Sequence, residues 1–218
     1  MKGYTAMKKH IRTILVALMT LSLIMLAGCG GGSSEQAEAP DTSQPELVKA
    51  ADPIGIHHAE IEIEGYGTVS VELDGDTAPL TVQNFMDLAN AGFYNGLTFH
   101  RIIDGFMIQG GDPNGDGTGG SGKNITGEFA ANGYENNIAH TKGVISMARA
   151  QDPDSASSQF FIMVADAPHL DGMYAAFGHV TDGQDIVDKI AADAKPLDDN
   201  GTIAAEDQPV ITSVKIID

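Results

Sequence analysis

The sequence predicts a fold dominated by β-structure, an eight-stranded antiparallel barrel closed on itself and capped by two α-helices. Three observations lead to this fold class. Many short segments alternate apolar with polar residues, glycine-rich connections separate these segments, and only two segments have the apolar spacing of a helix. Short antiparallel strands in such number typically close into a barrel, and the few helices then cover its openings.

The first two strands form a predicted hairpin. Apolar residues alternate through 58–64 and again through 68–74, and a Gly65-Tyr66-Gly67 turn separates the two segments. A helix opens at Ala78-Pro79, with Pro79 at an early helical position and Gly92 just after its end. Further strands are expected at 97–103, 106–109, 143–148, 159–164, 175–180 and 209–217, and a second helix at 183–192.

The N-terminal residues are typical of a secretory signal. Residues 1–13 carry basic and no acidic side chains, and residues 14–26 form an apolar run too short to span a membrane comfortably. The next residues, Leu26-Ala27-Gly28-Cys29, resemble the lipobox of bacterial lipoproteins, and Cys29 is the only cysteine. This resemblance implies cleavage before Cys29 and attachment of acyl chains to it. The alternative is an ordinary signal peptide whose cysteine is incidental or buried.

The chain is therefore expected to have three parts. Residues 1–28 are the lipoprotein signal peptide, residues 29–57 are the lipidated Cys29 with a disordered tether, and residues 58–218 are the folded domain. The tether is predicted from its Gly, Ser, Pro, Glu and Gln content, because such a composition offers almost nothing to bury.

The charge of the chain argues against two classes of partner. It has 30 acidic and 12 basic residues, a net charge of −18, and four of the basic residues lie in the predicted signal. Nucleic-acid binding is disfavoured because phosphate contacts need clustered Lys and Arg. Anionic lipid headgroups should also repel the domain, so we expect it to contact the membrane only through the lipid anchor.

The stretch 99–112, Phe-His-Arg-Ile-Ile-Asp-Gly-Phe-Met-Ile-Gln-Gly-Gly-Asp, carries the strongest chemical signal. It combines the permanently charged Arg101 and the amide of Gln109 with several large apolar side chains on predicted strands. This mixture suits a site that holds a neutral, partly apolar group and makes one strong hydrogen bond to it. The stretch closely resembles the signature of the cyclophilin family of peptidyl-prolyl cis-trans isomerases.

Further motifs support the resemblance, which covers about residues 58–218. They are Gly117-Thr118-Gly119-Gly120, the run 143–150, the run 158–162, Leu170-Asp171-Gly172 and Phe177-Gly178, in that order. The resemblance implies a cyclophilin-like fold. It also implies that the catalytic residues are Arg101, Gln109 and Phe106, and that the substrate is bound by Met107, Ala148, Arg149, Ala150, Gln159, Phe161, His169, Leu170 and Tyr174.

Three of these positions depart from the familiar eukaryotic pattern. His169 stands where many cyclophilins have tryptophan, and Tyr174 where they have histidine. Because the indole N–H of that tryptophan matters for binding of the inhibitor cyclosporin, weak inhibition is expected while catalysis is not in doubt. Arg149 replaces a frequent asparagine whose backbone makes the substrate contact, so the change should be tolerated.

The sequence implies no cofactor and no metal. Asp112 to Asp116 resemble the first half of a calcium-binding EF-hand loop, but the twelfth loop position is Lys123 rather than Glu and no helix precedes the loop. A weak calcium site at the surface is the most that this segment could offer. His100 and His140 are expected to be structural, because neither has a carboxylate or cysteine at triad or metal spacing.

The residues and the resemblance together predict a peptidyl-prolyl cis-trans isomerase that accelerates rotation about Xaa-Pro bonds and assists the folding of exported proteins. Its expected partners are unfolded or proline-containing polypeptides. It is expected to be monomeric and extracytoplasmic, anchored by lipid to the bacterial cell membrane, or to the outer membrane if one exists. The alternative is a non-enzymatic chaperone or docking module that binds proline-containing peptides without isomerising them.

Overall fold

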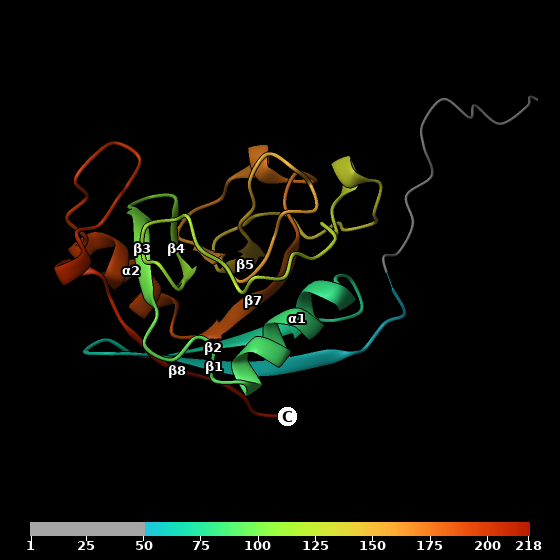
Figure 1. Cartoon of the computed structure of the whole chain (residues 1–218), viewed down its shortest axis with the longest axis horizontal. Coiled ribbons are helices and arrows are strands. Elements are labelled where there is room, and N and C mark those ends of the chain that lie inside the picture. Colours follow the sequence, from blue (N-terminus) through green and yellow to red (C-terminus); the bar gives the residue numbers. More distant parts are fainter. Residues whose placement is uncertain (1–50) are drawn as a thin grey trace, which may run out of the picture. The chain divides into compact units, whose positions relative to one another are not determined.

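A computed structural model of the chain describes residues 51–218. These residues form one antiparallel sheet of eight strands, in the order β3-β4-β6-β5-β7-β2-β1-β8, together with two α-helices (Figure 1). The elements are β1 (Ile56–Ile63), β2 (Gly67–Asp74), α1 (Pro79–Asn90), β3 (Thr98–Ile103), β4 (Met107–Asp112), β5 (Val144–Met147), β6 (Phe160–Met163), β7 (Ala176–Asp182), α2 (Gln184–Asp193) and β8 (Ile211–Ile216). The predicted eight strands and two helices are thus confirmed.

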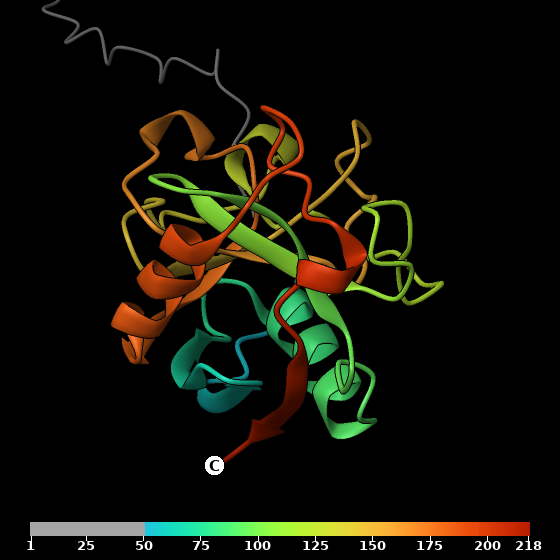
Figure 2. The ribbon, with the colours of Figure 1, turned by 90° about the vertical axis from the view of Figure 1, so that its left-hand side faces the viewer.

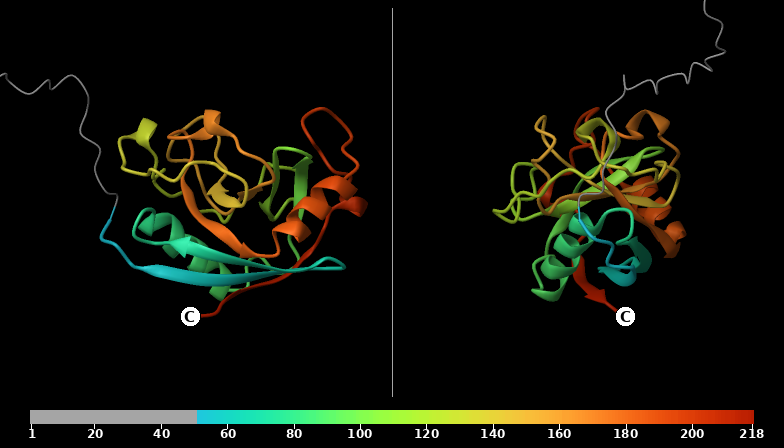
Figure 3. Two further views of the ribbon diagram at one scale, coloured as in Figure 1. Left: turned by 180° about the vertical axis from the view of Figure 1, so that it is seen from behind. Right: turned by 90° about the vertical axis from the view of Figure 1, so that its right-hand side faces the viewer.

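The sheet curls into a half-barrel instead of closing evenly on itself. Its two outer strands, β3 and β8, meet only near their ends, where Thr98 pairs with Val210 in an isolated bridge. Three backbone hydrogen bonds extend this contact, from Gly96 to Ile211, from Ile211 to Leu97 and from Phe99 to Pro209. Figures 2 and 3 show the curled sheet from both ends and from behind. The expectation of a fully closed barrel is corrected accordingly.

The alternation of side chains along the strands separates two apolar clusters. Phe160 on β6 points into the main core, where its ring lies edge-on to those of Phe85 and Tyr94. The next residue, Phe161, points to the other face of the sheet and belongs to a smaller cluster with Met107 and others. Because successive strand residues face opposite sides, one Phe-Phe pair serves both the core and the outer face.

Helix α1 is held at its N-terminus by a buried carboxylate. Glu128 accepts hydrogen bonds from the backbone N–H groups of Leu80 and Thr81, at 3.0 and 2.7 Å, and from the hydroxyl of Thr81 at 2.6 Å. Pro79 occupies the start of the helix, where its missing N–H costs nothing. The carboxylate satisfies donors that a helix terminus otherwise leaves unpaired, and it fixes α1 against the core.

The structure adds three short 3₁₀-helices that the sequence did not predict: η1 (Ala130–Asn132), η2 (Pro168–Leu170) and η3 (Ala205–Asp207). Within residues 51–218, no helix is both long and apolar enough to span a membrane. The predicted signal, Cys29 and most of the predicted tether lie outside the described residues.

Candidate functional site

The site is built on a row of paired residues that crosses four neighbouring strands. Arg101 on β3 lies opposite Gln109 on β4, Gln109 lies opposite Phe161 on β6, and Phe161 lies opposite Ser146 on β5. Directly opposed residues in an antiparallel sheet share one face, so the charge, the amide and the ring are neighbours. The antiparallel register therefore brings together two motifs about fifty residues apart in the sequence.

A cavity of about 210 Å³ opens beside this row. It combines one guanidinium and one amide with aromatic and aliphatic side chains. Its lining consists of Arg101, Phe106, Met107, Gln109, Ala148, Arg149, Phe161, Leu170 and Tyr174. All nine are residues that the sequence predicted for the site, and the structure places them around one cavity. Their individual roles stay predictions.

Arg101 is held from two sides by hydrogen bonds. Its Nε donates to the backbone oxygen of Asn200 at 2.7 Å, and its Nη1 donates to Oε1 of Gln109 at 3.1 Å. Burial lowers the pKa of the Arg101 guanidinium, whereas Tyr174 and Asp198 act in the opposite direction. The group nevertheless keeps its proton, because an arginine is not deprotonated in a protein. Arg101 is therefore a fixed, charged donor in the lining of the cavity.

A chain of amide hydrogen bonds continues from Gln109 along the groove. Nε2 of Gln109 donates to Oε1 of Gln159 at 2.9 Å, and Nε2 of Gln159 donates to the backbone oxygens of Gly117 and Gly119 at 3.1 and 2.8 Å. Since Arg101 can only donate, it fixes which end of the Gln109 amide faces it, and each following amide is oriented in turn. The loop that contains Gly117 and Gly119 is thereby connected to Arg101 through these hydrogen bonds.

The apolar wall of the cavity is supported by a buried histidine. The rings of His140 and Phe161 stack with centroids 6.0 Å apart, and Tyr174 packs edge-on to both. Nδ1 of His140 lies 3.2 Å from Oδ1 of Asp171, and Nε2 lies 3.0 Å from Oγ of Ser146. The expectation that His140 has no carboxylate partner is wrong, because Asp171 contacts it. Asp171 lies 31 residues later in the sequence, which is not a spacing that marks a partner.

This Asp171, His140 and Ser146 arrangement has the order of a catalytic triad but cannot act as one. The Ser146 side chain is completely buried and His140 is 1% exposed, so no substrate reaches the hydroxyl. The arrangement instead fixes the plane of His140, which supports Phe161. His140 is thus structural, as the sequence predicted, although for a different reason.

Arg149 joins two walls of the groove through its own side chain. Its guanidinium lies 5.0 Å from the ring centroid of Phe129 and 4.8 Å from that of Tyr174. Nε and Nη2 both donate to the backbone oxygen of Met173, at 3.1 and 2.8 Å, and Nη1 donates to that of Ala150 at 2.9 Å. The sequence predicted only a backbone role here, and nothing in the sequence indicated this second function.

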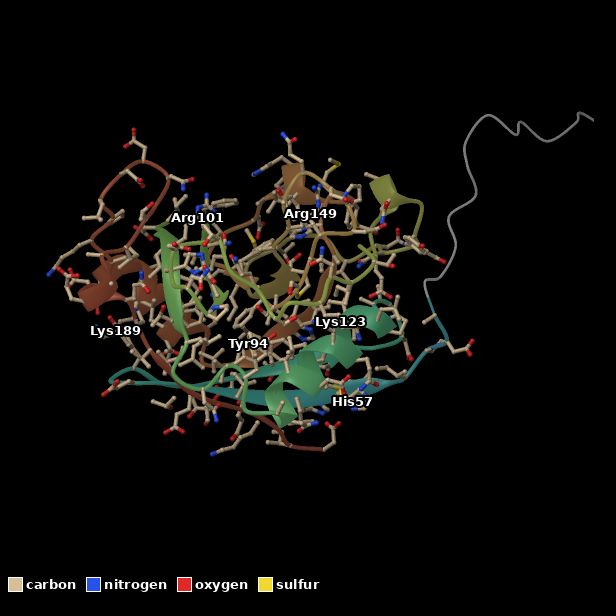
Figure 4. The ribbon with its side chains drawn as sticks, viewed as in Figure 1. His57, Tyr94, Arg101, Lys123, Arg149 and Lys189 are labelled. Carbon is tan, nitrogen blue, oxygen red and sulfur yellow. The ribbon has the colours of Figure 1, made fainter. Side chains whose placement is uncertain are left out.

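The remaining predicted residues lie beside the cavity rather than in it. Ala150 and Gln159 line an adjoining cavity of about 440 Å³, which shares Gln109, Ala148 and Arg149 with the first. His169 is exposed and stacks on Phe106, with ring centroids 5.8 Å apart. Figure 4 shows Arg101 and Arg149 on the side of the sheet away from α1. A groove thus extends from the small cavity into the larger one.

The loop that resembles a calcium-binding segment is organised around a buried carboxylate. Oδ1 of Asp112 accepts the N–H of Asn114, and Oδ2 accepts those of Asp116 and Gly117. Asp112 is only 1% exposed, and these backbone groups satisfy its buried carboxylate. Within residues 51–218, no three His, Cys, Asp or Glu side chains are grouped so that they could hold a metal ion.

Sequence reasoning missed Asn200, whose backbone oxygen holds Arg101 from a loop 99 residues away. The only local signal is the turn-forming Asn200-Gly201 pair, which predicts a turn but not its neighbour.

Comparison with protein families gives one match over the folded part. Residues 58–217 match the family described as cyclophilin type peptidyl-prolyl cis-trans isomerase/CLD. A peptidyl-prolyl cis-trans isomerase of Helicobacter pylori is 48% identical over 126 residues, covering 57% of this chain and 74% of its own length. Peptidyl-prolyl cis-trans isomerase B of Bacillus subtilis is 48% identical over 121 residues, covering 56% of this chain and 81% of its own.

Solved structures agree with the sequence matches. The crystal structure of a cyclophilin type peptidyl-prolyl cis-trans isomerase from Cryptosporidium parvum superposes with a TM-score of 0.66 at 30% identity. It covers 75% of this chain and 98% of its own. The same protein crystallised in the presence of the dipeptide Ala-Pro gives a TM-score of 0.65 at 30% identity, covering 74% and 99% of the two chains.

Proposed function

Because the chain belongs to the cyclophilin family of peptidyl-prolyl cis-trans isomerases, we propose that the Arg101 groove accelerates rotation about Xaa-Pro bonds in exported polypeptides. One observation carries the assignment of the site. A fixed guanidinium and a set of apolar side chains line the same cavity of about 210 Å³. A proline residue offers the matching pair of features, an apolar ring and an amide nitrogen.

The barrier to be lowered is about 18–20 kcal/mol and comes from amide resonance. Twisting the bond localises the lone pair on the proline nitrogen, so a donor near that nitrogen stabilises the twisted form more than either planar form. The Nη2 group of Arg101 has no hydrogen-bond partner among the described residues, whereas Nε and Nη1 are engaged. We assign this donor role to Arg101, and no covalent step is required.

The apolar side of the cavity holds the proline ring while the rest of the bond rotates. Phe106, Met107, Phe161 and Leu170 supply this surface. Phe161 and Leu170 are 5% and 8% exposed, so they are fixed by their own packing. Gln109, which contacts Arg101, is assigned to the peptide backbone next to the proline. Excluding water around the ring strengthens the single charged hydrogen bond.

Replacing Arg101 tests this assignment. An Arg101→Ala variant should lose about two to three orders of magnitude in kcat/KM, as expected for removal of one transition-state donor. Exchange spectroscopy on a proline peptide measures turnover directly, and titration of the same peptide measures binding. Retained binding with lost turnover supports the isomerase mechanism. Unimpaired turnover would overturn the role of Arg101, and binding without any turnover in the wild type would favour a docking module.

We also propose that the protein is a lipoprotein that works outside the cytoplasmic membrane. The basic and apolar N-terminus followed by Leu26-Ala27-Gly28-Cys29 supports this proposal. Two or more acyl chains on Cys29 would anchor the chain stably, whereas one would hold it only marginally. Metabolic labelling with a fatty-acid analogue should mark the wild type and not Cys29→Ser. Equal labelling of both would refute the anchor.

The groove lies within a single chain, so we propose that the protein acts as a monomer on proline-containing segments of unfolded clients. Light scattering at working concentration should give the mass of one chain, and a dimer mass would contradict it.

A further inference from the structure

The loop between α2 and β8 forms an additional edge to the sheet beside β3. The N–H of Ile102 donates to the oxygen of Gly201 at 2.8 Å, and the N–H of Ile203 donates to the oxygen of His100 at 3.0 Å. Thr202 forms a bridge with Arg101 between these two bonds. Since β3 is an outer strand of the sheet, the loop pairs backbone groups that would otherwise be open. Figure 2 shows this part of the chain, in red, passing β3.

The loop is closed by its own hydrogen bonds. The carboxylate of Asp198 accepts the N–H of Thr202 at 3.0 Å and its hydroxyl at 2.9 Å. The N–H of Leu197 donates to the oxygen of Thr202 at 2.7 Å, and that of Gly201 to the oxygen of Asp198 at 3.1 Å. These bonds set the loop's shape independently of the groove.

Gly201 allows the loop to approach β3 closely. Its φ of +85° lies in the left-handed region, and a Cβ at this position would lie 2.5 Å from Cγ1 of Ile103 and 2.6 Å from the oxygen of Ile102. Neither distance is possible for a real side chain, and the second neighbour is backbone. Any larger residue must therefore move the loop away from β3.

This close approach brings the oxygen of Asn200 to within 2.7 Å of Nε of Arg101. The second hold on the guanidinium comes from Gln109, which accepts from Nη1. The two acceptors come from different parts of the chain and engage different nitrogen atoms. Together they fix both the position and the plane of a group that is otherwise long and flexible.

We infer that the loop 197–202 is a positioning element for Arg101, delivering the Asn200 oxygen that orients the guanidinium toward the bound peptide. This inference rests on the proposed function, because it assumes that Arg101 acts on the proline nitrogen. Asn200, Gly201, Asp198 and Thr202 act through Arg101 and are positioning residues. A small displacement of a correctly aligned donor can cost about a hundredfold in rate.

The test compares Gly201→Ala with Gly96→Ala in the full-length chain. Gly96 has a φ of +84° but no atom within 4 Å of its would-be Cβ, so it shares the backbone strain without the clash. Gly201→Ala should lower kcat by about tenfold or more while KM changes less than about threefold. Gly96→Ala should lose only the thermal stability that the shared backbone strain costs, and it should keep its kcat. An unchanged kcat in Gly201→Ala, or an equal loss in Gly96→Ala, overturns the inference.

Two less disruptive variants, both at Thr202, keep the test decisive if Gly201→Ala does not fold. Thr202→Val removes the hydroxyl that closes the loop, and Thr202→Ser retains it. Thr202→Val should lower kcat and broaden or shift the Arg101 Nε–H signal in NMR spectra, and Thr202→Ser should restore both. If the signal and kcat are the same in both variants, the loop does not position Arg101.

A double-mutant cycle separates failure of this inference from failure of the proposed function. In an Arg101→Ala background, Gly201→Ala should have no further effect on turnover, because the group that it positions is already gone. A full additional loss in that background would show that the loop acts by another route. If Arg101→Ala alone kept wild-type turnover, it would be the proposed role of Arg101 that fails.

Discussion

The imidazole of His140 lies nearly parallel to the ring of Phe161, at an interplanar angle of 18° and a centroid distance of 6.0 Å. The hydrogen bonds of the two ring nitrogens agree with one neutral form, in which Nδ1–H donates to Asp171 and Nε2 accepts from Ser146. Protonation of Nε2 would place a positive charge on a buried ring that is stacked on Phe161, and burial disfavours that charge. Burial therefore favours a neutral His140 in the wall of the cavity.

The free energy of unfolding should decrease as the pH falls below about 6.5, the ordinary pKa of histidine. Burial lowers the pKa of His140, with Asp171 opposing, and burial also lowers that of His100. Between the lowered pKa values of the folded state and pH 6.5, the unfolded chain binds more protons than the folded chain. The stability that the two neutral histidines contribute is therefore present above this pH window and is lost as the pH falls through it. Urea unfolding at a series of pH values measures the effect.

His100 offers a variant that isolates part of this dependence. Its two ring nitrogens are buried without a partner among the described residues. His100→Leu should therefore be nearly neutral or stabilising at pH 7.5, because it removes unsatisfied polar atoms. It should also reduce the slope of stability against pH below 6.5. An unchanged slope would mean that His100 does not titrate as its burial implies.

Removing the Arg149 side chain should weaken peptide binding more than turnover. Arg149 lies between Phe129 and Tyr174 and holds the backbone of Met173, so its loss frees one wall of the groove. Arg149→Ala should raise KM by about tenfold, the equivalent of one charged contact of about 1.4 kcal/mol, and change kcat by less than about threefold. Steady-state kinetics on one proline peptide separates the two constants.

Arg149→Lys is the matched control for charge. A lysine keeps the positive charge but cannot stack as a plane between two rings while donating twice to one oxygen. It should therefore resemble Arg149→Ala. If Arg149→Lys restored the wild-type KM, simple charge rather than the planar contact would be responsible.

How much the sequence could predict depended on the range of the interaction. The strands and both helices followed from local periodicity, which is a property of neighbouring residues. The grouping of Arg101 with Phe161 followed only from the family resemblance. The Asn200 contact, the Asp171 partner of His140 and the Met173 contact of Arg149 depend on loop conformations. No spacing rule predicts where such loops meet.

The barrel was predicted to close fully for a similar reason. The number and antiparallel character of strands can be read from alternation, but the extent of contact between β3 and β8 depends on twist and on the residues at their ends. At the ends of these two outer strands, the bridge between Thr98 and Val210 and a few backbone hydrogen bonds join the two edges of the sheet. Cumulative twist over eight strands is not encoded in any one segment.

Interrupting the amide chain at Gln159 should reduce catalysis moderately. Gln159→Leu removes the acceptor of Gln109 and releases the oxygens of Gly117 and Gly119. The Gln109 side chain is then free to rotate, so its hydrogen bond with Nη1 of Arg101 weakens. The hydrogen bond from Nε of Arg101 to the oxygen of Asn200 is unchanged. We expect kcat/KM to fall by about three- to tenfold, the equivalent of one net hydrogen bond.

Gln208→Leu is the control for loss of a loop contact. Gln208 also ties loops together, through the oxygens of Gly115 and Ile203, but it lies outside the groove lining. It should reduce thermal stability without the loss in kcat/KM. A comparable kinetic loss in both variants would indicate general loosening instead of a connection to Arg101.

Exchanging His169 for tryptophan should make the protein more sensitive to cyclosporin. His169 is exposed and stacks on Phe106 at an interplanar angle of 27°, so a larger flat ring fits the same orientation. The indole adds an N–H donor at the position where many cyclophilins carry one. One additional hydrogen bond of about 1–1.5 kcal/mol corresponds to an inhibition constant about tenfold lower, measured by inhibition of peptide isomerisation.

His169→Phe distinguishes the donor from the ring. Phenylalanine can stack on Phe106 as the indole does, but it has no N–H. If the hydrogen bond is what matters, inhibition of His169→Phe should stay close to that of the wild type while His169→Trp improves. Equal improvement in both variants would assign the effect to apolar contact. No improvement in His169→Trp would contradict the expectation that the missing indole at this position limits inhibition.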